Sequence, residues 1–243
     1  MKKTGKQLLA ALLAACMLAP LCGCEEKVKV DVHLTYDGER DVLVNPAADC
    51  AYTWASVSYE PAYVGEPYAD WDKTLLYQVK GWEPETLLTE EFSGVGGLLY
   101  NENYALPTLG EMNADTIYVC VGETSTSCIY LIEDKDTVAR AAELMETGET
   151  VELPGDGVLT MSLKFTSPDY EGIYYSILYI EMGEEIEDDR YLYDRGTKRC
   201  VKIEDDLFLG TLYGGEEPEL PENAGGTVDE NGDVIFNFDA QNT

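Results

Sequence analysis

Histidine is almost absent from this chain, and positive charge is scarce. Among 243 residues there is one His, at position 33, and 16 Lys and Arg stand against 47 Asp and Glu, for a formal net charge of −31. Zinc sites with two or more His ligands are therefore excluded, and a nucleophile with a histidine base would depend on His33 alone. Nucleic acid is excluded as a partner, because phosphate binding needs clustered Lys and Arg.

His33 lies in residues 27–34, where valines and Leu34 alternate with charged side chains. Such alternation is typical of a strand with one buried face. His33 falls on the charged face, so we expect an outward-facing strand residue there.

Cysteine is sparse after residue 24, and no Cys-x-x-Cys motif occurs, so redox and zinc-knuckle motifs are missing. Cys120 and Cys128 flank a segment that is typical of a hairpin turn centred on Thr124. Cys120 and Cys128 are the best candidates for a disulfide, with free thiols as the alternative. Closing so short a loop would contribute about 2 to 3 kcal/mol.

Long apolar runs are missing as well. The longest, residues 8–21, is interrupted by Pro20 and is shorter than the about 20 residues that a transmembrane helix needs. Lys2, Lys3 and Lys6 precede it, as in an export signal. The run ends in Leu21-Cys22-Gly23-Cys24, which resembles the lipobox of bacterial membrane lipoproteins, with Leu at −3, a small residue at −1 and the modified Cys at +1.

This resemblance implies cleavage before Cys24, diacylation of Cys24 and an extracytoplasmic protein anchored to the cell membrane by that lipid. The acidic chain should be repelled by anionic lipid, so the acyl chains and not the protein surface would provide the attachment. The strand pattern begins only a few residues after Cys24, which predicts a short tether.

The remaining sequence predicts a β-rich α+β fold with antiparallel sheets and one short packed helix. We expect the helix at residues 137–147, capped by Asp134 or Asp136, with one apolar stripe and Gly148 at its end. Residues 60–72 are expected to form a loop, and a short helix is expected from residue 83. Strands are expected at 27–34, 41–44, 51–58, 74–80, 94–100, 116–121, 128–132, 158–165, 172–182, 190–193 and 200–203.

Composition divides the chain into a signal peptide (1–23), a β-rich domain (24–213), an acidic flexible linker (214–226) and a terminal β-hairpin or tail (227–243). Asn231-Gly232 is a typical hairpin turn. Asp229, Asn231 and Asp233 resemble the start of a calcium loop, but Gly232 precedes the third oxygen ligand, so a plain turn is the stronger interpretation.

Aromatic residues concentrate between residues 52 and 104, including all three tryptophans. Trp54, Trp71 and Trp82 could stack on sugar rings, although core packing is the more common use of such residues. A basic cluster at residues 190–202 follows an acidic run, which favours local ion pairs over an anion site.

These patterns predict a lipid-anchored, non-catalytic binding or sensor module of the cell envelope, with no cofactor and with a glycan or an envelope protein as the possible partner. The alternative is a glycan-active hydrolase with paired carboxylates, or a glycan-binding lipoprotein. No particular carboxylate pair is singled out by its sequence context.

Overall fold

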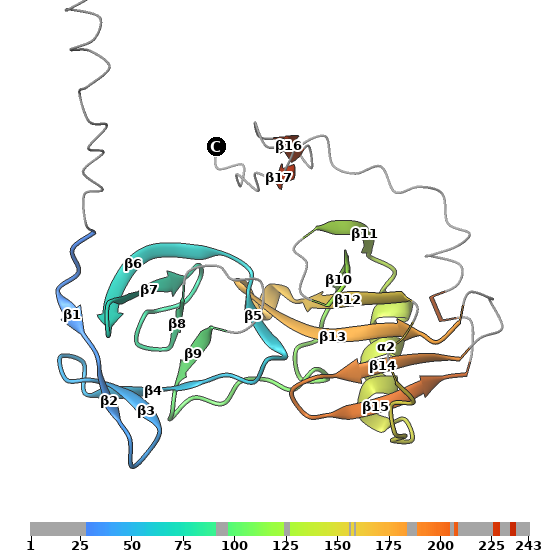
Figure 1. Cartoon of the computed structure of the whole chain (residues 1–243), viewed down its shortest axis with the longest axis horizontal. Helices are drawn as coiled ribbons and strands as arrows, with labels where there is room; N and C mark the ends of the chain where they lie inside the picture. The colour runs from blue at the N-terminus through green and yellow to red at the C-terminus, as the bar shows by residue number, and fades with distance from the viewer. Residues whose placement is uncertain are drawn as a thin grey trace, which may run out of the picture.

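Two sheets and one α-helix make up most of this computed structural model (Figure 1). The β-rich α+β class predicted from the sequence, with antiparallel sheets and a single packed helix, is confirmed among the described residues. The structure describes residues 28–90, 97–123, 127–155, 157, 159–183, 189–204, 207–208, 226–228 and 234–236.

The first sheet closes into a ring. Its strand order is β1-β6-β7-β8-β9-β4-β3-β2, and the strands at the two ends, β1 (Val32–His33) and β2 (Thr35–Asp37), are consecutive segments joined through Leu34. β1 pairs in parallel with β6, whereas β2 pairs antiparallel with β3. The other strands of the ring are β3 (Val42–Asn45), β4 (Cys50–Trp54), β6 (Val64–Trp71), β7 (Thr74–Val79), β8 (Leu87–Thr89) and β9 (Leu98–Asn101).

Apolar side chains fill the ring. Leu43, Leu76 and Leu99 are fully buried at its centre, and each contributes about 1.5 to 3 kcal/mol by leaving water. Tyr52 is buried with them, and its hydroxyl donates a hydrogen bond to the carbonyl of Pro84. The one polar atom of this tyrosine is therefore satisfied, and the ring needs no buried charge to close.

The second sheet is antiparallel, with strand order β11-β10-β12-β13-β14-β15. One face carries Leu163, Phe165 and Ile177, which pack beneath the helix. The opposite face carries Ser162 and Lys164, which are buried although polar. The strands are β10 (Thr116–Val121), β11 (Cys128–Ile132), β12 (Leu159–Thr166), β13 (Ile173–Glu181), β14 (Arg190–Asp194) and β15 (Arg199–Ile203).

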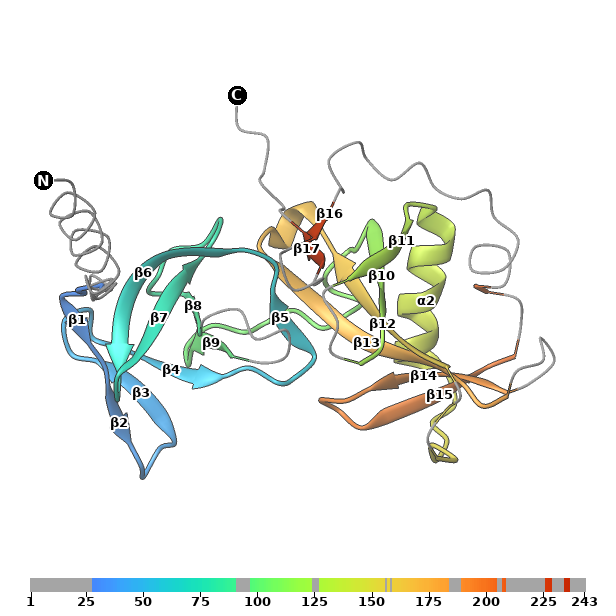
Figure 2. The ribbon, with the colours of Figure 1, turned by 45° about the horizontal axis from the view of Figure 1, so that its top comes forward.

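Helix α2 (Lys135–Thr147) lies across the apolar face of the second sheet, as Figure 2 shows. Asp134 begins it by accepting a 2.9 Å hydrogen bond from the N–H of Thr137. Val138, Ala141 and Met145 form the buried stripe. The predicted helix, its cap and its stripe are thus confirmed.

A side chain from β15, an edge strand of the second sheet, caps the C-terminus of α2. Arg199 donates hydrogen bonds to the carbonyls of Met145 (2.6 Å) and Gly148 and to the hydroxyl of Thr150 (2.6 Å). Gly148 has an ordinary φ of −60°. Its Cβ, if present, would lie 2.5 Å from the carbonyl oxygen of Leu144, so close packing and not a left-handed turn requires glycine there.

The short strand β5 (Tyr59–Pro61) joins the two sheets. It leaves the ring after β4 and pairs with residues 173–175 of β13. β14 pairs with residues 178–181 along the rest of β13. Since β5 and β14 both pair with β13 in successive stretches, they lie end to end in the second sheet.

The loop predicted for residues 60–72 is wrong, because most of β5 and all of β6 lie within it. The alternation expected of a strand is hidden there for two physical reasons. Glu60 is a buried charge, and Pro67 falls between two register shifts in the pairing of β6 with β7.

The helix expected from residue 83 is also wrong. The N–H groups of Thr86 and Leu87 both bond to the carbonyl of Glu83, which makes a single turn. β8 then begins at once, because Leu87 and Leu88 are fully buried between β7 and β9. Burial in the sheet therefore outweighs the local helix signal of Pro84.

The hairpin predicted near the C-terminus is present as two short antiparallel strands, β16 (Gly226–Val228) and β17 (Val234–Phe236). The Asn231-Gly232 turn lies outside the described residues, as do most of the acidic linker 214–226 and the domain boundaries at 23/24 and 213/214.

Candidate functional site

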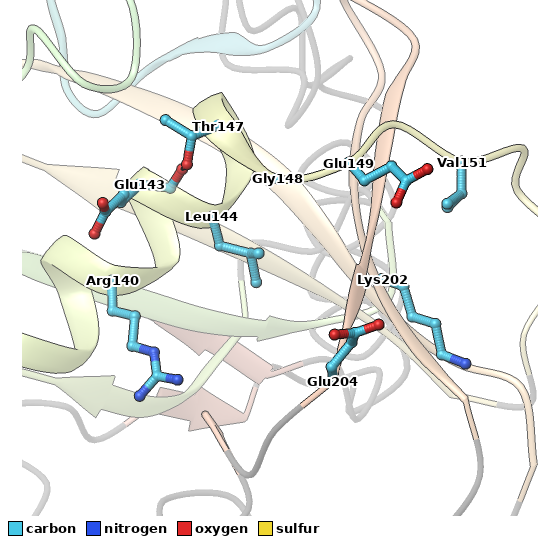
Figure 3. Close-up of a pocket in the computed structure, with 9 residues that line it drawn as sticks. All are labelled: Arg140, Glu143, Leu144, Thr147, Gly148, Glu149, Val151, Lys202 and Glu204. Carbon is cyan, nitrogen blue, oxygen red and sulfur yellow. The ribbon is translucent and has the colours of Figure 1, made fainter.

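A first hollow, of about 440 Å³, lies between the C-terminal half of α2 and β15. Figure 3 shows Leu144 pointing from the helix toward the strand, with charged side chains around it. Lys202 is engaged in a 2.6 Å ion pair with Asp189. The charged lining residues are Arg140, Glu143, Glu149, Lys202 and Glu204.

This first hollow has a weak case as a ligand site. Small-molecule sites are lined mainly by apolar and aromatic side chains, with a few polar groups that converge. Here Leu144 and Val151 are the only large apolar side chains among the described lining residues, and opposite charges alternate around them. A solvated groove beside a helix end explains this lining.

A second hollow, of about 250 Å³, has the more selective lining and is called the tyrosine cleft below. It lies at the connection between β5 and β6, beside the start of β10 and the turn between β12 and β13. Tyrosines dominate its walls, and its charged lining residues are both acids. Its aromatic and acidic lining residues are Tyr63, Tyr118, Tyr170, Tyr174, Asp115 and Glu171.

Backbone pairing between distant segments positions these walls. The N–H of Ala62 bonds to the carbonyl of Gly172 at 2.8 Å, which brings the residues after β5 against the β12–β13 turn. Gly172 has a φ of +92°, and a Cβ at this position would lie 2.1 Å from the carbonyl oxygen of Lys80. Only glycine allows this approach. The N–H of Asp115 bonds to the carbonyl of Thr166 at 3.0 Å and fixes the third wall.

The tyrosine rings meet at steep angles. The rings of Tyr118 and Tyr174 have centroids 5.7 Å apart and planes at 65°, so together they form a corner that presents the face of one ring beside the edge of the other. Tyr170 is backed by Trp82, which stacks on it at 6.4 Å and 19°. Trp82 also donates its Nε1–H to the carbonyl of Glu171 at 2.6 Å.

The hydroxyls of Tyr118 and Tyr174 stay neutral over the ordinary pH range. Burial raises the pKa of Tyr118 and of Tyr174 above the usual value for a phenol, and neighbouring tyrosines add to the effect. The acidic residues of the described lining are Asp115 and Glu171. One carboxylate oxygen of Asp115 accepts a 3.1 Å hydrogen bond from the hydroxyl of Thr116.

A buried ion pair supports the cleft from the polar face of the second sheet. Lys164 and Glu60 are joined at 2.6 Å, with side chains 5% and 3% exposed. The guanidinium of Arg195 lies 3.5 Å from the other oxygen of Glu60. The ammonium of Lys164 also lies 5.7 Å from the ring centroid of Tyr174. The pair thus fixes β5 and one wall of the cleft together.

Asp194 marks the point where β5 and β14 meet. It is buried and accepts hydrogen bonds from the hydroxyls of Ser58, Tyr175 (2.8 Å) and Thr197 (2.8 Å), and from the N–H of Gly196 (2.8 Å). Burial alone would raise the pKa of Asp194, but these hydrogen bonds outweigh it and hold that pKa below its usual value.

The three predicted stacking tryptophans fall into two places, and none lines the described part of either hollow. Trp54 and Trp71 pack edge to face at 5.7 Å, and the half-exposed Tyr36 lies 6.4 Å and 6.2 Å from them. Trp82 backs Tyr170, as described above. We call Tyr36, Trp54 and Trp71 the ring aromatic cluster.

Cys120 and Cys128 lie opposite each other in β10 and β11, beside a bulge, and both are free thiols in the structure. A hydrogen bond between the thiols raises the pKa of Cys120 and lowers that of Cys128. The pairing in the sheet agrees with the predicted hairpin, whose turn at Thr124 lies outside the described residues. The disulfide remains a prediction.

Of the remaining predicted site residues, the structure describes His33 and leaves the lipidation and calcium candidates outside its described part. His33 is exposed and bonds through Nδ1 to Asp70 at 2.6 Å, as expected of an outward strand residue. No three His, Cys, Asp or Glu side chains gather as a metal site in the part of the chain that the structure describes. Cys24 and the weak calcium candidates Asp229, Asn231 and Asp233 lie outside the described residues.

Sequence reasoning did not find the tyrosine cleft. Tyr63 falls in the aromatic-rich segment that was noted, but Tyr118, Tyr170 and Tyr174 lie far along the chain. The sequence contains one weak signal for the cleft. Gly172 lies between Tyr170 and Tyr174, and a glycine can indicate that another backbone segment approaches closely at that point. Which segment approaches Gly172 depends on the pairing of β5 with β13, which no local pattern specifies.

Comparison with known proteins adds no relative. No protein-family model, no curated protein and no solved structure matches the chain. Among the helices that the structure describes, none is long and apolar enough to span a bilayer.

Proposed function

We propose that this chain is a lipid-anchored protein of the cell envelope that binds a small ligand in the tyrosine cleft without transforming it. The observation that carries the proposal is the cleft itself, which combines tyrosines and two carboxylates from separate segments in one cavity of about 250 Å³. Convergence of aromatic walls with a few polar groups is the usual composition of a ligand site.

The position of the cleft supports this choice over the other hollow. It lies at the junction between the ring and the helix-backed sheet, and cavities at such junctions are common ligand sites. Its walls are fixed by Gly172, by the Asp115–Thr166 backbone contact and by the buried Glu60–Lys164 pair. A site held in shape before the ligand arrives loses less conformational entropy on binding.

The envelope location rests on the lipobox Leu21-Cys22-Gly23-Cys24. A Cys24→Ala variant should lose the acyl chains and move from the detergent phase to the aqueous phase in a phase-partition assay. Mass spectrometry of the N-terminal peptide should find a diacylated Cys24 in the parent protein. An unmodified Cys24 in membrane-bound protein would contradict the anchor.

A second candidate function is hydrolysis of a glycan by paired carboxylates. One observation favours it: Asp115 and Glu171 line the same cleft, and Trp82 contacts the backbone of Glu171. In such an enzyme one carboxyl group protonates the leaving oxygen, while the other attacks the sugar or activates water. If the protein hydrolyses a glycan, and both Asp115→Asn and Glu171→Gln abolish that activity, hydrolysis would replace binding as the function.

The test of the proposed function is a ligand panel on the purified full-length protein in detergent, read by thermal shift. A ligand at 100 times its dissociation constant should stabilise the fold by about 2.7 kcal/mol. A Tyr118→Leu variant should lose the shift, whereas Trp54→Leu in the ring aromatic cluster should retain it. Equal loss in both variants would contradict the assignment of the cleft.

A further inference from the structure

The charge of the tyrosine cleft points to the class of its ligand. Its described lining contains Asp115 and Glu171 and no Lys or Arg. The whole chain carries a formal net charge of −31, so a cation is attracted and an anion is repelled over the Debye length. A ligand for this cavity should therefore carry positive charge where it meets the rings.

We propose that the tyrosine cleft binds an alkylated ammonium group, such as the trimethylammonium head of choline. This inference rests on the proposed binding function and specifies its ligand. A methylated ammonium has a diffuse positive charge and an apolar surface, and it binds against the electron-rich faces of aromatic rings. The Tyr118 and Tyr174 rings both line the cleft, and with their planes at 65° they place the face of one ring beside the edge of the other.

Two of the cleft tyrosines already contact ammonium groups of the protein. Lys80 Nζ lies 5.2 Å from the ring centroid of Tyr63, and Lys164 Nζ lies 5.7 Å from that of Tyr174. Both distances are within the about 6 Å of a cation–π contact. Glu60 compensates the positive charge of Lys164, whereas Lys80, over the ring of Tyr63, offsets part of the negative charge that Asp115 and Glu171 give the lining.

Size also favours a compact cationic group over an oligosaccharide. The cavity of about 250 Å³ is below the range of about 300 to 1,000 Å³ that is usual for drug-sized ligands. A sugar ring stacks flat on one aromatic face, whereas steeply inclined rings surround a roughly spherical group better.

The test compares choline with 3,3-dimethylbutan-1-ol, which has the same shape but carbon in place of the charged nitrogen. The measurement is calorimetric titration of the purified full-length protein in detergent. We expect choline to bind at least about tenfold more tightly than its neutral isostere. Equal affinities would overturn the ammonium assignment while leaving a binding cleft in place.

Three variants locate the effect. Tyr118→Leu should reduce choline affinity by about tenfold through loss of one ring face, and Asp115→Asn should weaken it by a smaller factor. Tyr36→Leu in the ring aromatic cluster is the matched control and should leave the affinity unchanged. Loss in Tyr36→Leu, with none in Tyr118→Leu, would overturn the location.

Further ligands in the same titration distinguish a soluble ligand from a lipid headgroup. They also show whether a negative result refutes the ammonium ligand alone or the binding function as well. Free choline and vesicles of phosphatidylcholine distinguish a soluble cation from a lipid headgroup, and the adjacent phosphate should disfavour the vesicles because of Asp115 and Glu171. Neutral oligosaccharides complete the panel. Binding of an oligosaccharide that Tyr118→Leu abolishes, without choline binding, would refute the ammonium ligand and keep the proposed function. Binding of nothing would refute both.

Discussion

The ring and the β5 junction are built on different physical principles. The ring closes mainly around leucines and one tyrosine whose hydroxyl is satisfied, and its buried polar residues, Asn45 and Thr89, carry no charge. The junction instead buries Glu60, Lys164 and Asp194, whose charges need polar or oppositely charged partners. Apolar packing tolerates substitution, whereas buried charges impose one geometry. The buried charges therefore restrict the backbone and side-chain geometry most strongly at the β5 junction, which lies beside the tyrosine cleft.

The largest effect should come from Lys164→Met. It leaves the buried Glu60 with Arg195, at 3.5 Å, as its remaining cationic neighbour, and breaking a buried pair in this way costs about 3 to 5 kcal/mol. Chemical denaturation measures the loss. The double variant Glu60→Leu with Lys164→Met should recover only part of the loss, because it takes Glu60 away from the largely buried Arg195.

The matched control is Lys80→Met, because Lys80 also lies over a tyrosine ring but is exposed. It should change stability by less than about 1 kcal/mol. If Lys164→Met and Lys80→Met had equal small effects, the contrast between junction and ring would fail.

Asp194 should provide the next largest effect and a pH dependence. Because hydrogen bonds lower its pKa in the fold, it stabilises the fold above its unfolded pKa of about 3.9. This contribution is lost as the pH falls through the lower, folded pKa. Asp194→Asn should cost about 1 to 3 kcal/mol at neutral pH and flatten the acid limb of the stability profile. An unchanged acid limb in Asp194→Asn, measured by denaturation at several pH values, would contradict this role.

How far the sequence predicted the fold depended on the range of the contacts. The hairpins β10–β11, β12–β13 and β14–β15 join neighbouring segments, and alternation with turn residues located them all. The helix followed from Asp134 and one apolar stripe. Closure of the ring through Leu34, and the addition of β5 to β13, pair segments far apart in the chain, and no local pattern records such partners.

The same reasoning explains what was missed at the candidate site. Tryptophan density pointed to Trp54 and Trp71, which pack on each other at the ring. The cleft instead collects tyrosines that are spread from Tyr63 to Tyr174, and they meet only because β5 pairs with β13. Glu60 looked like a loop residue because its ion pair with Lys164 cannot be seen in the sequence.

A smaller effect is expected at the helix end. Arg199→Met removes the hydrogen bonds to the carbonyls of Met145 and Gly148, and loss of such end contacts should cost about 1 to 2 kcal/mol. Lys198→Met is the control, since Lys198 is an exposed neighbour. Equal thermal stability of the two variants would show that Arg199 does not close the helix.

The smallest effect should come from the ring aromatic cluster. Tyr36→Leu removes two ring contacts at the surface, and such aromatic pairs contribute about 0.5 to 1.5 kcal/mol beyond area burial. The variant should lose a little thermal stability and keep full ligand binding. Loss of binding in Tyr36→Leu would move the functional surface from the junction to the ring.

The central claim is that the tyrosine cleft is where a ligand meets this protein. The most direct measurement is an NMR titration of the full-length protein with labelled tyrosine rings, using choline and assigning the relevant signals among the 17 tyrosines by Tyr→Phe substitution. The account predicts shifts at Tyr63, Tyr118, Tyr170 and Tyr174 and none at Tyr36. Shifts confined to Tyr36, or no shifts with any ligand of the panel, would contradict it.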